Sequence, residues 1–318
     1  KAIAASLLGG QRKAVLLGHA AAQHPQAANL LALAHWIGKH TGASVGYLGE
    51  GGNGVGAQLV GAMPGSAGLN AGQMLSLPMK ALLLLNTEPV LDAADAMAAR
   101  KALSGAGLVV ALTPFKDVAA DLADVMLPIT PFTETAGTFV NAEGRVQSFH
   151  GVVKPLGDSR PGWKVLRVLG NLLGLPGFDF ETADEVRVEA LGDLAELPAR
   201  LNNASDAPLV PAAAVVQGLQ RVADVPIYTS DAIVRRATSL QLTADARGEP
   251  VVGVPSALWK QLGLQPGGKV LVAQGEGAVV LPAREDPSLA ANAVRVSAGL
   301  PLTSSLGPMF GAIAVEKV

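Results

Sequence analysis

Short apolar runs alternate with helical patterns over the first two-thirds of the chain. The apolar runs are typical of strands buried on both faces of a sheet, and they lie at residues 14–18, 81–85, 108–112 and 124–128. Helices are expected at residues 25–40, 92–103, 117–123 and 163–173, and a polar helix is expected at 182–201. This alternation predicts an α/β domain in which all four strands form one mostly parallel sheet with helices on both faces.

The pattern changes twice further along the chain. Residues 132–149 alternate with period two around Glu143-Gly144, which predicts a β-hairpin. Beyond Pro226, short strands are expected at residues 227–228, 251–254, 269–273, 278–281 and 294–296. Short strands separated by Pro-Gly turns, with one brief helix at 256–262, predict a closed barrel. The expected division is an α/β domain at 1–204, a linker at 205–225 and a smaller barrel domain at 226–318.

Composition excludes several classes of protein. The chain has 318 residues, so roughly two domains are expected, and its 24 basic and 26 acidic residues are interspersed, which argues against nucleic acid as a partner. It contains no Cys, which excludes disulfides, thiolate nucleophiles and iron–sulfur clusters held by Cys of this chain. The five His residues lack metal-ligand spacing, and no Ser lies in a G-x-S-x-G turn. We therefore assign no catalytic and no metal-binding residue.

The charge-free stretch from Gly51 to Met79 is the longest in the chain. The mean hydropathy of the whole chain, +0.36, invites a membrane interpretation, but glycines and the prolines Pro64 and Pro78 interrupt this stretch. We expect no membrane span. Because large exposed apolar patches are rare in soluble monomers, we expect the stretch to be an interface, covered by the barrel or by a missing part of the protein.

Two motifs leave alternatives open. Residues Gly49 to Gly54 fit G-x-G-x-x-G, which in a dinucleotide-binding fold approaches a pyrophosphate, yet no acidic residue follows about 20 positions later. A packed loop is the favoured interpretation, and an independent nucleotide-binding module is the rival. Arg235 and Arg236 form the second motif, and they are suited either to gripping a phosphate or partner carboxylate or to locking the two domains together.

Several segments coincide in order with a known family. They are Asn53-x-x-Gly56 with Pro64, Asn86-Thr-Glu-Pro89, Leu122-Ala-Asp-Val-Met-Leu-Pro128 and Glu134-Thr-Ala-Gly-Thr-Phe-Val-Asn-Ala-Glu-Gly-Arg-Val-Gln147. Together they resemble the molybdopterin oxidoreductase superfamily. Residues 137–162 and 228–240 further resemble the large iron–sulfur subunit of bacterial respiratory NADH:quinone oxidoreductase (complex I).

The resemblance implies a fold for the C-terminal region and a missing N-terminal half of the protein. Residues 226–318 would be the double-psi β-barrel that closes the dinucleotide site in molybdenum enzymes. An N-terminal half bearing cysteine-ligated iron–sulfur clusters would be missing, which agrees with a Cys-free chain that starts at Lys1. The implied partners are that half and other peripheral-arm subunits of complex I, and the implied location is the cytoplasmic face of the inner membrane, without a membrane span of its own.

The resemblance also places a cofactor cleft that we expect to be vestigial. Its lining would include Asn86, Thr87, Glu88 and Thr113. Cofactor-using relatives commonly carry an Asp where this chain has Thr113, and a neutral side chain there offers no carboxylate to a guanine edge. We therefore expect no cofactor in this fragment.

The expected function is a structural and interaction region of complex I that supports electron transfer from NADH to quinone without chemistry of its own. The alternative is the cofactor-binding part of a molybdopterin-dependent oxidoreductase such as a formate dehydrogenase, with the molybdopterin dinucleotide between the two domains.

Overall fold

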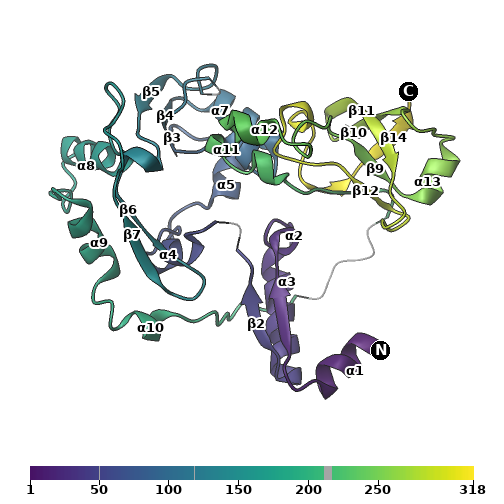
Figure 1. Ribbon diagram of the computed structural model, residues 1–318, viewed down its shortest axis with the longest axis horizontal. Coiled ribbons are helices and arrows are strands. Elements are labelled where there is room, and N and C mark those ends of the chain that lie inside the picture. The colour runs from purple at the N-terminus through teal and green to yellow at the C-terminus, as the bar shows by residue number, and fades with distance from the viewer. Residues whose placement is uncertain (50, 118, 211–216) are drawn as a thin grey trace.

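The computed structural model describes residues 1–49, 51–117, 119–210 and 217–318 (Figure 1). Its first sheet has two parallel strands, with Ala14 opposite Ser44. Helix α3 is the crossover between them, and it ends at Gly42, whose φ of 72° suits a glycine C-cap. The elements of this region are α1 (Ala2–Gly9), β1 (Ala14–Leu17), α2 (His19–Ala22), α3 (Ala27–Thr41) and β2 (Ser44–Tyr47).

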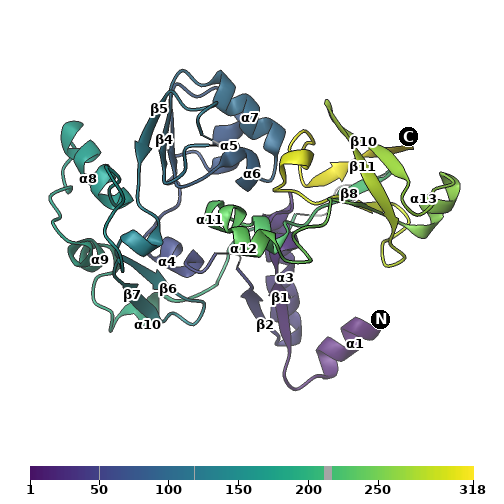
Figure 2. The ribbon, with the colours of Figure 1, turned by 45° about the horizontal axis from the view of Figure 1, so that its top comes forward.

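A second sheet has three parallel strands in the order β3-β4-β5. Helices α6 and α7 pack on one of its faces around a core of Leu82, Val90, Leu103 and Val109 (Figure 2). The elements are α4 (Gly54–Leu59), α5 (Ala71–Ser76), β3 (Leu82–Leu85), α6 (Pro89–Asp92), α7 (Ala96–Gly105), β4 (Val109–Thr113) and β5 (Val125–Pro128).

The α/β class with parallel sheets is confirmed, but the expectation of one sheet is wrong. Strand β1 pairs with β2 and not with β3, so the four expected strands divide between two sheets among the described residues. Sequence reasoning missed β2 because Ser44-Val-Gly-Tyr47 is short and only partly apolar. The residues expected as a helix at 117–123 form turns where they are described.

The expected hairpin is present, and three α-helices follow it along the chain. Strands β6 (Gly137–Val140) and β7 (Val146–Phe149) pair antiparallel. The expected helix at 182–201 is two helices, because Gly192 adopts a φ of 68° after α9. The accompanying elements are the 3₁₀ helix η1 (Phe132–Glu134) and helices α8 (Gly162–Leu172), α9 (Ala183–Leu191) and α10 (Leu197–Arg200).

The C-terminal strands form a curled, mixed seven-stranded sheet in the order β13-β8-β12-β9-β11-β10-β14. Its interior is the largest core, built on residues such as Val252, Val270 and Val294. The strands are β8 (Gln220–Val222), β9 (Val252–Val254), β10 (Lys269–Gln274), β11 (Gly277–Glu285), β12 (Ala293–Arg295), β13 (Phe310–Ala312) and β14 (Ala314–Lys317). The helices are η2 (Ile227–Thr229), α11 (Ala232–Arg236), α12 (Thr238–Gln241), α13 (Ser256–Gln261) and η3 (Pro301–Thr303).

This sheet corresponds only in part to the expected barrel. The strand pairings leave β13 and β14 at opposite ends, so a closed double-psi barrel stays a prediction. Residues 227–228 lie in the 3₁₀ helix η2 and not in a strand, because Pro226 precedes them and its carbonyl accepts the Thr229 N–H.

The domain division stays a prediction, although strand β8 bears on its linker. Part of the expected linker, residues 211–216, lies outside the described residues, whereas β8 falls within 205–225 and pairs with β12 and β13. Across the described ranges, every helix is too short or too polar to cross a lipid bilayer.

Candidate functional site

Asn86, Thr87, Glu88 and Thr113 lie where strands β3 and β4 end. Ligand sites of open α/β sheets form at this carboxyl edge. Asn86 turns the chain there with a φ of 50°, in the left-handed region that Asn tolerates better than most residues. Pro89 then begins α6, so Thr87 and Glu88 are held between a strand end and a helix start.

The Glu88 carboxylate is buried and fully engaged by this chain's own arginines. Only 6% of Glu88 is exposed. Its Oε2 accepts hydrogen bonds from Arg235 Nε at 3.0 Å and Nη2 at 2.7 Å, and its Oε1 accepts one from Arg236 Nη2 at 2.6 Å. Charge-assisted, bidentate contacts of this kind are the strongest hydrogen bonds available to a carboxylate.

Two further carboxylates complete the cluster, which we call the arginine clamp: Arg235, Arg236, Glu88, Asp92 and Asp117. Asp92 Oδ1 accepts from Arg235 Nη2 at 2.8 Å, and Asp117 Oδ1 accepts from Arg236 Nη2 at 2.6 Å. Burial lowers the pKa of Arg236, but the hydrogen bonds and charges of Asp117 and Glu88 outweigh it, and the net pKa is raised. The clamp therefore holds the Arg236 guanidinium firmly charged.

Local structure aims both arginines at the strand ends. Helix α11 begins at Asp231, whose Oδ1 accepts from Ile233 N at 2.8 Å and Val234 N at 2.9 Å. The Arg235 Nη1 also donates to Thr229 O at 2.8 Å. Sequence reasoning singled out the arginine pair with two interpretations, and the structure shows the one in which the pair joins the C-terminal region to the α/β region.

Thr87 and Thr113 serve the same corner in different ways. Thr87 Oγ1 donates to Asp92 Oδ2 at 3.0 Å, so Thr87 supports the clamp. Thr113 Oγ1 accepts from Phe115 N at 3.1 Å, which shapes the turn that brings the Phe115 ring to 4.2 Å from Arg236 Cζ. Sequence reasoning missed Asp92, Asp117 and Phe115, because nothing in their local patterns indicates a partner so distant in the chain.

Three of the four expected cofactor residues, Thr87, Glu88 and Thr113, are engaged within the protein and offer little to a molybdopterin dinucleotide. Its pyrophosphate requires unpaired donors, whereas the two guanidiniums of the clamp face three carboxylates. The cavity lined by Thr87, Glu88 and Thr113 measures about 20 Å³, which is room for one water molecule. A cofactor in this protein would have to be held by other groups.

A buried arginine in the C-terminal sheet fixes a second contact with the α/β region. Arg221 on β8 is 2% exposed, and burial lowers its pKa to about 10. Its guanidinium donates to the Gln274 side chain and to the carbonyls of Val296, Ser297, Gly307 and Pro308. These bonds fix the loop that ends at Met309, whose N–H donates to Ala94 O in the α/β region.

The glycine-rich motif at residues 49–54 makes a packing contact. Residue 50 of the motif lies outside the described residues. The rival hypothesis of a nucleotide-binding module requires a strand before the motif and a helix after it, and β2 and the six-residue helix α4 lie at these places. However, Asn53 Oδ1 accepts from Val140 N at 2.8 Å, and a Cβ at Gly56 would lie 2.1 Å from that oxygen. The Asn-x-x-Gly spacing therefore docks α4 on the hairpin, as expected for a packed loop.

The start of the charge-free stretch packs on the hairpin and its helices. Val55 and Leu59 are partly buried against the core formed by Val140 of the hairpin, Leu191 of α9 and Leu197 of α10. This contact was not among the expected ones, and cover of the rest of the stretch by a missing part of the protein stays a prediction.

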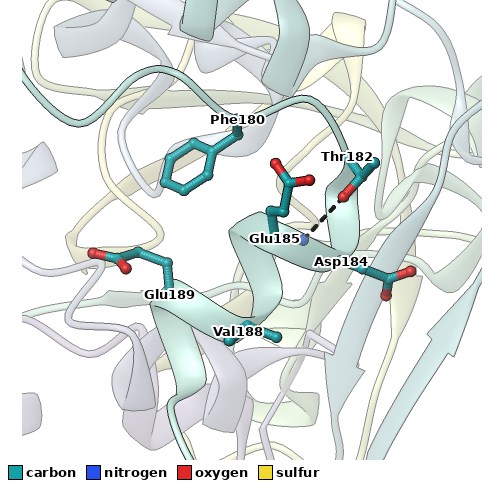
Figure 3. Close-up of a pocket in the computed structure, with 6 residues that line it drawn as sticks. All are labelled: Phe180, Thr182, Asp184, Glu185, Val188 and Glu189. Atoms are coloured by element: carbon teal, nitrogen blue, oxygen red, sulfur yellow. Dashed lines mark hydrogen bonds between the residues drawn. The ribbon is translucent and has the colours of Figure 1, made fainter.

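An open hollow of about 400 Å³ lies beside the start of α9 (Figure 3). Its polar residues cap the helix: Thr182 Oγ1 accepts from Glu185 N, and Glu185 accepts from Glu181 N, a backbone hydrogen bond that lowers the pKa of Glu185. The described residues contain no group of side chains that could hold a metal ion.

One of the comparisons with known proteins identifies a family. Residues 1–172 match the family model described as "Molybdopterin oxidoreductase". The chain is 45% identical over 60 residues to the "Putative formate dehydrogenase" proteins of Staphylococcus aureus strains bovine RF122 and USA300, a match that covers 19% of this chain and 6% of each relative. The structure of acetylene hydratase from Pelobacter acetylenicus is similar with a TM-score of 0.56 at 16% identity, over 84% of this chain and 50% of that one.

Proposed function

The chain belongs to the molybdopterin oxidoreductase family, and from that premise we propose that it forms part of a molybdopterin-dependent oxidoreductase of the formate dehydrogenase type. The observation that carries the proposal is the 60-residue segment that is 45% identical to the staphylococcal relatives. This supports the alternative function weighed from the sequence better than a role in complex I.

The contribution of this chain is to position the parts around a redox centre. Molybdopterin supplies a metal that exchanges electrons with the substrate. The clamp at Glu88 holds α11 against the ends of β3 and β4, and the loop fixed by Arg221 holds the C-terminal sheet against Ala94. Such contacts fix the geometry between domains, which is where ligand sites commonly form.

Formate oxidation by the full-length gene product tests the proposal. Formate gives carbon dioxide, a proton and two electrons, and each molecule of an oxidised viologen dye accepts one electron. We expect formate-dependent dye reduction by protein expressed with molybdate or tungstate. Absence of reduction in protein that contains stoichiometric metal would contradict a formate dehydrogenase function.

The arginine clamp favours a second candidate, the peripheral-arm scaffold of complex I. Three of the four expected cofactor residues already have partners within the chain: Thr87 hydrogen-bonds to Asp92, Glu88 pairs with arginine, and Thr113 stabilises a turn. This suits a region that binds no cofactor. If the chain is such a scaffold, we expect the tagged full-length protein to co-purify with a complex that oxidises NADH. We then expect it to contain neither molybdenum nor tungsten and not to oxidise formate.

A further inference from the structure

The outer edge of strand β3 is an unprotected sheet edge. The Leu82 N–H donates to Leu108 O and the Asn86 N–H donates to Leu112 O, so alternate residues of β3 direct their peptide groups toward β4. The peptide groups of Leu83 and Leu85 therefore face the opposite edge, and no strand in the described part of the chain pairs there.

The side chains next to this edge are about half exposed, although the start of α8 at Gly162 approaches Leu85. Leu83 is 49% exposed and Leu85 46%, and Val125 on the same face of β5 is 43% exposed. Parallel sheets are normally covered on both faces, because their connections place helices there. Helices α6 and α7 cover only the other face, around Leu82.

The edge lacks most of the features that keep free edges apart. Native edge strands are protected by charges, prolines or bulges, or by being short. Strand β3 is short, but its four residues, Leu82 to Leu85, are all leucines, so it carries neither a charge nor a proline. From these observations we propose that the outer edge of β3 and its Leu83–Leu85 face dock a further parallel strand with its crossover helix. The occupant is polypeptide of the same protein beyond these 318 residues.

The length of a relative with the same fold favours this occupant. The similarity to acetylene hydratase covers 84% of this chain but only 50% of that chain, so about as much polypeptide again surrounds the shared fold there. The β1-β2 sheet also favours further polypeptide as the occupant, because among the described residues it has only two parallel strands. It leaves Leu16 57% and Leu48 58% exposed. Isolated two-stranded sheets are marginally stable in water.

A second copy of this chain is the competing occupant. Two β3 edges related by a twofold axis would pair antiparallel, extending a parallel sheet with a mismatched strand and leaving the leucine face without a helix. Pairing of this kind depends on protein concentration.

Amide hydrogen exchange with residue-level mass spectrometry tests the proposal without any substitution. The 318-residue chain and the full-length gene product are compared at Leu83 and Leu85, with Leu82 and Asn86, which bond to β4, as internal controls. We expect exchange at Leu83 and Leu85 to slow by about tenfold or more in the full-length product, corresponding to about 1.4 kcal/mol, while the controls are slow in both proteins.

Two results would overturn the proposal. One is equally fast exchange at Leu83 and Leu85 in the full-length product. The other is concentration-dependent protection of both amides in the 318-residue chain, which would identify a second copy as the occupant. The measurement is independent of cofactor content, so it stands whether or not the proposed oxidoreductase function holds.

Discussion

Glu88 shows at the scale of one residue why the site could be predicted only in part. Sequence reasoning singled out Glu88 and the Arg235–Arg236 pair separately, for different reasons. Their contact spans 147 residues along the chain, and no local pattern encodes a pairing over such a separation. Glu88 was expected to line a cleft, and it is instead buried under guanidiniums that leave no free carboxylate oxygen.

We predict that Glu88→Gln destabilises the contact between the two regions. The substitution removes the buried carboxylate that both guanidiniums share and leaves Arg235 with Asp92 and Arg236 with Asp117 as their carboxylate partners, which we expect to cost about 2 kcal/mol. Urea unfolding together with limited proteolysis of the α11 segment measures the effect. Asp184→Asn is the matched control, because Asp184 is 64% exposed in its pair with Arg187 and its loss is expected to cost less than about 1 kcal/mol. Equal effects of the two substitutions would contradict a structural role of the clamp.

At the scale of elements, strongly patterned segments were predictable and weakly patterned ones were not. The apolar runs that became β3, β4 and β5 and the period-two hairpin were located correctly. Strand β2, with its partly polar sequence, and the short helix α11 were missed, because each is defined by its packing partners and not by its own periodicity. Helix α9 ends early since Gly192 takes up a left-handed φ that periodicity does not reveal.

The hairpin turn depends on a glycine for two separate reasons. Gly144 has a φ of 79°, and a Cβ there would lie 2.1 Å from Leu201 Cδ1. We predict that Gly144→Ala lowers the free energy of unfolding by about 2 kcal/mol, from backbone strain and overpacking together. Gly105→Ala at the end of α7 is the control, because nothing lies within 4 Å of its added Cβ, and it is expected to be neutral or to stabilise by about 0.5 kcal/mol. Thermal unfolding followed by circular dichroism compares the two, and an unchanged melting temperature for Gly144→Ala would refute the contact.

Helix α4 belongs to an internal core, so a charge there acts on folding. We predict that Val55→Asp destabilises the 318-residue chain by about 3 kcal/mol in urea unfolding, because Val55 packs against Val140 and Leu191. Val60→Asp is the control, since Val60 is 44% exposed next to the same helix. Normal stability of Val55→Asp combined with failed assembly of the full-length protein would instead support a docking role.

At the scale of the whole molecule, two arginine networks hold the α/β region against the C-terminal region. The clamp joins α11 to the ends of β3 and β4, and Arg221 fixes the loop that reaches Ala94. The sequence indicated two regions of different texture and a family resemblance, and the family is confirmed. It did not indicate how the regions meet, because that depends on side chains brought together only by folding.

The metal content of the full-length protein tests the central claim most directly. Mass spectrometry of the purified gene product, grown with molybdate or tungstate, measures molybdenum and tungsten per polypeptide. A molybdopterin-dependent oxidoreductase predicts about one metal atom per chain, held by groups other than the clamp, so that it persists in Glu88→Gln. Metal-free protein that is folded and assembled with its partners would contradict the proposed function and favour the complex I scaffold.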